Sequence, residues 1–276
     1  MLLFTVYSLL ATAVIAFASS SEGAQDDTDA ITLTVVNHWP IYECSVYGLD
    51  VWENGSSMGV AFCTYDSDSL LSFDPEDWNN ISSLGPLAAS NNNSYGVAVN
   101  DNLTSPPVWV TSNMNDTLFY TDDNFVTWNS FNHPGGGTQA YDMDFDGSHY
   151  WVTNGSNSVT RFQISGSSQN FTLHELGGTA RLLCVFPYQL SFGLAVARRT
   201  GLLHFYSWNE ASLDYLGNCD FPTGYWDSYG LAFSESRDTM FWSYSTASGI
   251  PCIYELNLGI EVSLNHSTWG AIKASY

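Results

Sequence analysis

The most specific chemical pattern in the sequence is a run of alternating carboxylates, Asp142-Met-Asp-Phe-Asp-Gly147. Such a run opens many calcium-binding loops, because carboxylate oxygens are the ligands that this hard cation prefers. The pattern therefore predicts Asp142, Asp144 and Asp146 as metal ligands. The twelfth position of a calcium loop is usually a bidentate glutamate, whereas here it is Thr153. The sequence thus favours a hairpin turn at Asp146-Gly147 and no cofactor, with calcium as the alternative.

Other residue types that carry catalysis are scattered along the chain. The sequence contains no Gly-x-Ser-x-Gly segment, and its six histidines show no metal-ligand spacing. Asp50 and Asp144 occupy equivalent places in an internal repeat and are expected to line one channel. The matching residues in the other copies are Ala98, Cys184 and Ala232. Two carboxylates opposite small residues make an incomplete metal cage and equally suit a polar lining around water. The sequence favours a protein that is not an enzyme, without closing that question.

Aromatic side chains are the other candidates for ligand contact. The sequence has 10 Trp, 16 Tyr and 16 Phe, and most are expected to fill a core. Trp52 and Trp226 lie near turns and next to acidic residues, an arrangement that often holds a sugar. Together with the two channel aspartates, they give a predicted ligand-binding set of Asp50, Trp52, Asp144 and Trp226.

These residues are placed by a repeat that recurs five times. The copies are Tyr47-Gly-Leu-Asp-Val51, Tyr95-Gly-Val-Ala-Val99, Tyr141-Asp-Met-Asp-Phe145, Arg181-Leu-Leu-Cys-Val185 and Tyr229-Gly-Leu-Ala-Phe233. Their first residues are 48, 46, 40 and 48 positions apart. Each copy is followed by further short runs of aromatic and β-branched residues, separated by turn residues such as Asn154-Gly155. A period in the forties with four strands per unit predicts an all-β propeller of about five four-stranded blades, with six as the alternative.

Two segments compete to complete the last blade. Residues 31–36 precede the first repeat in the way that an outer strand precedes the next blade, so they are one candidate for the outer strand that closes the ring. Residues 260–264 have the same local character. The sequence alone does not choose between them.

Two pairs of strands show a family resemblance. Tyr150-Trp-Val-Thr153 is followed by Val159–Ile164, and Met240-Phe-Trp-Ser243 is followed by Ile253–Leu258. Both pairs resemble the repeats of YWTD-type and NHL-type extracellular propellers. The resemblance implies the propeller architecture. Members of those families include receptor modules, scaffolds and lactonase-like or synthase-like enzymes, so the resemblance does not fix an activity.

The N-terminus and the charge indicate where the protein acts. Residues 1–18 are almost wholly apolar and predict a signal peptide, with cleavage as late as residue 24. Residues 19–30 are expected to form an acidic, Ser-rich segment, and residues 31–276 a single propeller domain. The chain has 6 Lys+Arg against 28 Asp+Glu and a formal net charge of −22. This charge argues against nucleic acid and anionic membranes as partners, and we expect no membrane insertion.

Sequons and cysteines support a secreted protein. Eight asparagines satisfy the N-glycosylation pattern, namely Asn54, Asn80, Asn92, Asn102, Asn115, Asn154, Asn170 and Asn265. Proximity within a repeat predicts the disulfide pairs Cys44–Cys63 and Cys219–Cys252, with Cys184 as a buried thiol. The alternative is that several cysteines are small apolar residues on strands.

The leading hypothesis from the sequence is a secreted, glycosylated, non-catalytic binding module for extracellular glycan or protein ligands. A structural subunit of a coat, wall or filament, which would self-associate, is the second hypothesis. A lactonase-like or synthase-like enzyme is the third.

Overall fold

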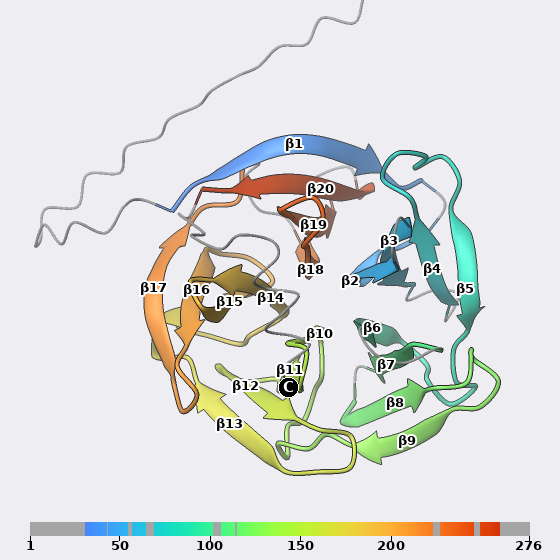
Figure 1. The fold of residues 1–276 in the computed structure, drawn as a ribbon, viewed down its shortest axis with the longest axis horizontal. Helices are drawn as coiled ribbons and strands as arrows, with labels where there is room; N and C mark the ends of the chain where they lie inside the picture. The colour runs from blue at the N-terminus through green and yellow to red at the C-terminus, as the bar shows by residue number, and fades with distance from the viewer. Residues whose placement is uncertain are drawn as a thin grey trace, which may run out of the picture.

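The computed structural model describes residues 31–42, 44–54, 57–64, 69–101, 106–113, 115–222, 227–245 and 249–259. The predicted signal peptide, the acidic segment and the competing strand at 260–264 lie outside the described residues. The chain forms five four-stranded antiparallel sheets arranged as blades around a central axis (Figure 1). The prediction of a five-bladed propeller is confirmed. In the described part of the chain, no helix is long and apolar enough to cross a membrane.

Each blade runs from an inner strand at the axis to an outer strand at the rim (Figure 1). The inner strands are β18 (Asp227–Ser234), β2 (Tyr47–Asn54), β6 (Ser94–Asn100), β10 (Met143–Phe145) and β14 (Leu182–Tyr188). The next strands are β19 (Thr239–Ser245), β3 (Ser57–Cys63), β7 (Val108–Asn113), β11 (Tyr150–Thr153) and β15 (Ser191–Ala197). The third strands are β20 (Pro251–Leu258), β4 (Ser69–Phe73), β8 (Thr117–Thr121), β12 (Ser158–Phe162) and β16 (Leu203–Trp208). The outer strands are β1 (Leu33–Pro40), β5 (Ser82–Pro86), β9 (Asn129–Asn132), β13 (Ser168–Thr172) and β17 (Leu213–Cys219).

A hydrophobic core fills each of the five junctions between neighbouring blades. At the junction of the β10 and β14 blades, for example, Trp151 packs with Phe171, Phe192 and Trp208. Alternate residues of one strand enter the cores on its two sides, because side chains in a strand point alternately to opposite faces. Thus Trp151 and Val152, next to each other on β11, belong to different junctions. The near-continuous hydrophobic runs of the inner strands follow from this burial on both faces.

The ring is closed by the N-terminal strand. β1 pairs antiparallel with β20 and becomes the outer strand of the blade that also contains β18 and β19. This pairing confirms the N-terminal alternative for ring closure. The register shifts between Val35 and Asn37, so Val36 is the extra residue of a β-bulge.

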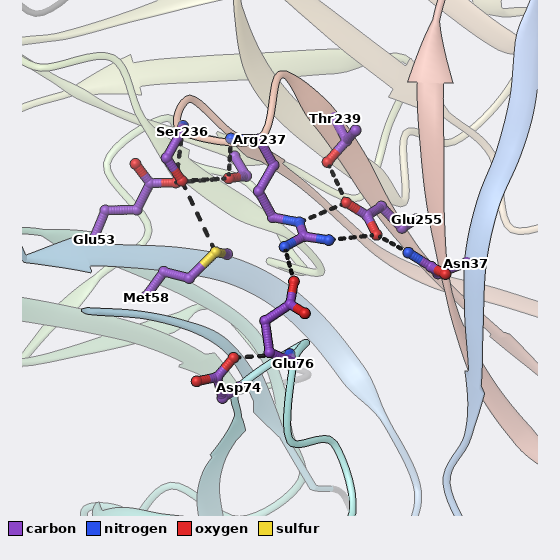
Figure 2. Close-up of polar contacts among 10 residues, drawn as sticks. Asn37, Glu53, Met58, Asp74, Glu76, Ser236, Arg237, Thr239 and Glu255 are labelled. Atoms are coloured by element: carbon purple, nitrogen blue, oxygen red, sulfur yellow. Dashed lines mark hydrogen bonds and ion pairs between the residues drawn. The ribbon is translucent and has the colours of Figure 1, made fainter. Parts of the chain in front are cut away.

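A polar cluster around Arg237, in the β18–β19 turn, joins the closing blade to the β2 blade (Figure 2). The Arg237 guanidinium donates to Glu255 of β20 at 2.6 Å from Nε and to Glu76 of the β4–β5 loop at 2.6 Å from Nη1. Glu255, which is only 1% exposed, also accepts hydrogen bonds from Asn37 of β1 and Thr239 of β19. One buried carboxylate therefore ties together the first and last strands of the fold.

The predicted disulfides are not formed, and all five cysteines lie in the described part of the chain. Cys44 packs against the core between the closing blade and the β2 blade, whereas Cys63 belongs to the core on the other side of the β2 blade. A whole sheet separates the two sides, so proximity in the repeat was a poor guide. Cys219 and Cys252 border one core as separate side chains. Cys184 is a buried thiol as expected, and Cys63 and Cys252 also behave as small buried residues.

Candidate functional site at one end of the central axis

The first residues of the five repeats meet at one end of the inner strands. We call this set the Tyr/Arg ring, and its members are Tyr47, Tyr95, Tyr141, Arg181 and Tyr229. The centroid of the Tyr47 ring lies 4.4 Å from that of Tyr229 and 4.8 Å from that of Tyr95. Tyr95 continues the circle to Tyr141 at 5.4 Å, and the Cζ atom of Arg181 lies 3.5 Å from the centroid of Tyr141. The contacts therefore run around the axis from Tyr229 to Arg181, and these two end residues both line one pocket.

Glycines make this close approach of the inner strands feasible. Gly48 follows Tyr47 in the left-handed region at φ +49°, and a Cβ atom there would lie 2.2 Å from the backbone oxygen of Tyr95. A Cβ atom at Gly230, after Tyr229, would lie 2.6 Å from the backbone of Gly48. Larger side chains at these positions would push the strands apart and open the ring.

A pocket opens between the ring and a second arginine. It is a shallow depression lined by Tyr95, Tyr141, Arg181, Arg199, Ser228 and Tyr229. Arg199 comes from the β15–β16 turn, and its Cζ atom lies 5.6 Å from the centroid of the Tyr229 ring. Its Nη2 atom donates to Asp227 at 2.5 Å and to the Tyr229 hydroxyl at 3.3 Å. The polar groups of this pocket are mainly guanidinium and phenol donors.

The phenols of Tyr47 and Tyr141 stay protonated at neutral pH. Burial, together with the neighbouring Tyr229 and Tyr95, raises the pKa of Tyr47. Burial also raises the pKa of Tyr141, although Arg181 and Arg199 act in the opposite direction. The Tyr141 hydroxyl donates to the Gln139 side chain, and the Tyr229 hydroxyl donates to Asp227 at 3.2 Å, so the guanidinium N–H groups of the two arginines are the main donors left for a ligand.

Beyond the ring, three buried aspartates bind backbone N–H groups at the axis. Each inner strand has a ladder neighbour on one side only, which leaves N–H groups turned toward the axis without a strand partner. Asp50 accepts from Val99 N at 2.6 Å, and Asp144 accepts from Val185 N at 2.7 Å. Each carboxylate thus bonds the inner strand of the next blade.

Asp142 links three blades. It stands where three other repeats have glycine, and its Oδ2 atom accepts from Leu183 N and from Leu231 N, each at 3.0 Å. Its Oδ1 atom is buried without a hydrogen-bond partner. Burial raises the pKa of Asp142 well above its ordinary value, and burial together with the nearby Asp144 does the same for Asp50. The axis therefore contains strand-joining carboxylates that favour the protonated form.

The predicted metal ligands do not share one site. Asp142 and Asp144 bond the β14 strand, whereas Asp146 bonds groups of its own blade, with its Oδ2 atom 2.8 Å from both Trp151 Nε1 and Arg161 Nε. The backbone N–H groups of Ser148 and His149 also donate to Asp146, which completes the hairpin turn. Among the described residues, no group of three or more His, Cys, Asp or Glu side chains is placed to hold a metal ion. The hairpin interpretation agrees with this geometry.

The predicted ligand-binding residues are also dispersed. Asp50 and Asp144 are both at the axis, as expected for equivalent repeat positions. Trp52 lies toward the far end of β2, partly buried, with its ring packed over its cross-strand partner Gly59. Trp226 lies outside the described residues. Sequence reasoning missed the Tyr/Arg ring because the opening residue of each repeat served only as a marker of the repeat.

The comparisons with known proteins define the class of fold. No family model matches the sequence, and no curated protein matches it. Glutaminyl cyclase from Myxococcus xanthus is similar in structure, with a TM-score of 0.56 at 12% identity over 82% of this chain and 96% of that one. The PQQ-bound aldose sugar dehydrogenase from Streptomyces coelicolor has a TM-score of 0.55 at 10% identity, over 83% and 98% of the two chains. A chain of the nidogen/laminin complex has a TM-score of 0.54 at 9% identity, over 79% and 86%. These similarities support the β-propeller fold, whose five blades are given by the sheet topology of this chain, and they leave the activity open.

Proposed function

We propose that this protein is a secreted, N-glycosylated, non-catalytic binding module whose extracellular glycan or protein ligand contacts the Tyr/Arg ring. The observation that carries the proposal is the pocket at the end of the axis, where tyrosines and arginines from four blades converge. Tyr95 and Tyr229 lie in strands, and Tyr141 and Arg181 lie just before strands, so binding costs little ordering entropy at these residues. Aromatic faces and hydrogen-bond donors suit recognition, and the described pocket residues include neither a nucleophile–base pair nor a metal cluster.

Binding should depend on the ring and not on tyrosine in general. A glycan array and a pull-down from extracellular material are expected to show binding by the wild-type protein that Tyr95→Ala reduces at least about fivefold, since the contact of an aromatic ring with a ligand is worth about 1 kcal/mol or more. Tyr42→Ala is the matched control, because Tyr42 is 73% exposed and is not a pocket residue. Two results would sink the proposal: no ligand in either assay, or equal binding by folded Tyr95→Ala.

The exposure of each sequon asparagine predicts which sites carry a glycan, and this tests the secreted and glycosylated part of the proposal. Asn80, Asn92, Asn115 and Asn170 are exposed, whereas Asn154 is 7% exposed and accepts hydrogen bonds from Ser156 and Ser158. Asn102, Asn265 and the side chain of Asn54 lie outside the described residues. A glycan on Asn154 is incompatible with this packing, so the folded secreted protein should lack it.

Glycopeptide mass spectrometry of protein secreted from eukaryotic cells measures this directly. We expect high occupancy at Asn115 in the β7–β8 turn and none at Asn154 after β11, two positions at corresponding places of neighbouring blades. Substantial occupancy at Asn154 in folded protein would contradict the structure. Absence of glycans from the exposed sequons at Asn80, Asn92 and Asn115 would count against N-glycosylation of this protein.

A further inference from the structure

The arginines of this chain are not all paired with carboxylates, despite the large excess of acidic residues. Arg161, Arg199 and Arg237 each form an ion pair. Within the described residues, Arg181 and Arg198 form none, although the chain has 28 Asp+Glu against 6 Lys+Arg. In a chain with this excess of acidic residues, most arginines are expected to pair with a carboxylate. An arginine without an acidic partner is therefore a candidate for contacting an anionic ligand.

Arg181 faces the pocket together with Arg199. The Cζ atom of Arg181 lies 3.5 Å from the centroid of the Tyr141 ring, a cation–π contact that holds this guanidinium at the pocket. Within the described residues, Arg199 donates to side chains from Nη2 alone, so its Nε and Nη1 N–H groups remain for a ligand. None of the six pocket-lining residues is acidic. The pocket therefore combines two guanidinium groups and contributes no side-chain carboxylate of its own.

We propose that this pocket binds the carboxylate of a small acidic sugar, a ligand class that rests on the proposed binding function. The planar fork of an arginine matches a carboxylate in two parallel hydrogen bonds. The parts of Tyr95 and Tyr229 that line the pocket offer apolar contact to a sugar ring. The ligand is a monoanion because Asp227 lies beside Arg199 and would repel a doubly charged group. The net charge of −22 likewise disfavours long polyanions, while a single carboxylate is held by short-range contacts.

Three probes of matched shape test this assignment on the full-length secreted protein. Ligand-observed NMR or calorimetric titration with glucuronate, its neutral methyl ester and glucose should show glucuronate binding at least about tenfold more tightly than the other two. Phosphate and sulfate should bind more weakly than glucuronate. Equal affinity for glucuronate and its methyl ester, or tighter binding of phosphate or sulfate, overturns the proposal.

Two variants of equal charge locate the site. Arg181→Met should remove most of the preference for glucuronate, whereas Arg198→Met, an equal loss of charge in the β15–β16 turn but outside the pocket lining, should retain it. Loss of the preference in both variants, or in neither, contradicts the assignment to this pocket. If Arg181→Met does not fold, the affinities of the wild-type protein for glucuronate and for its methyl ester still test whether a carboxylate is recognised. Binding of neutral glycans on the array, without binding of glucuronate in titration, would overturn this inference and leave the proposed binding function intact.

Discussion

Replacing Asp146 by alanine is expected to lower the free energy of unfolding by about 3–5 kcal/mol, the usual cost of removing one partner from a buried ion pair. The Asp146 side chain is fully buried and Arg161 is only 17% exposed. Alanine would leave this guanidinium and the Trp151 indole N–H without their acceptor. Chemical denaturation at neutral pH measures the loss.

Matched variants separate this network from a simple change in charge. Asp122 is exposed, so Asp122→Ala should change the free energy of unfolding by less than about 0.5 kcal/mol. Asp146→Asn keeps one oxygen acceptor and should fall between the two. A stable Asp146→Ala would show that the hairpin does not depend on this carboxylate. Calcium added to the wild-type protein should not raise its melting temperature, because Asp146 already binds protein donors.

Replacing Asp142 by alanine is expected to cost roughly 2–6 kcal/mol, because two buried N–H groups would each lose their acceptor at about 1–3 kcal/mol. These groups, Leu183 N and Leu231 N, belong to the inner strands of two other blades. The loss should therefore weaken contacts among three blades at once. Unfolding curves for Asp142→Ala and for the surface control Asp122→Ala provide the measurement, and equal stability of the two variants would contradict the structural role.

The same carboxylate gives stability a defined pH dependence. The pKa of Asp142 is raised by burial above 3.8, so between that value and the folded pKa the native state binds more protons than the unfolded chain. The contribution of Asp142 to stability must then fall as the pH rises above about 4, by proton linkage. Asp146 acts in the opposite direction, since Arg161 and the hairpin donors outweigh burial and lower its pKa, and its contribution is lost as the pH falls below about 4.

Asp142→Asn isolates this effect because asparagine does not titrate. Compared with the wild-type protein, the variant should gain stability between pH 4.5 and pH 8, whereas Asp122→Asn should show no such trend. A difference between Asp142→Asn and wild type that stays constant with pH would mean that Asp142 titrates as an ordinary carboxylate.

The sequence by itself determined the architecture. The repeat that begins at Tyr47 recurs with a period in the forties, and local patterns of alternating apolar residues and turns define four strands in each unit. These signals are local, so they can be recognised in the sequence without knowledge of long-range contacts. Ring closure was different, since residues 31–36 and 260–264 have similar local character. Only the pairing of β1 with β20, between segments more than 200 residues apart in the chain, settled it.

Tertiary structure alone decided which repeat positions carry the candidate site. Tyr47, Tyr95 and Arg181 occupy the same position in different copies of the repeat. Whether the residues at this position face solvent, a core or one another depends on how the inner strands meet at the axis. Arg199 lies outside the repeat and reaches the pocket from a turn, so no periodicity could have selected it. Asp142 looked like a calcium ligand because sequence spacing cannot show what a carboxylate faces. In the folded chain it meets backbone N–H groups of two other blades, which only the closed ring brings within hydrogen-bond distance.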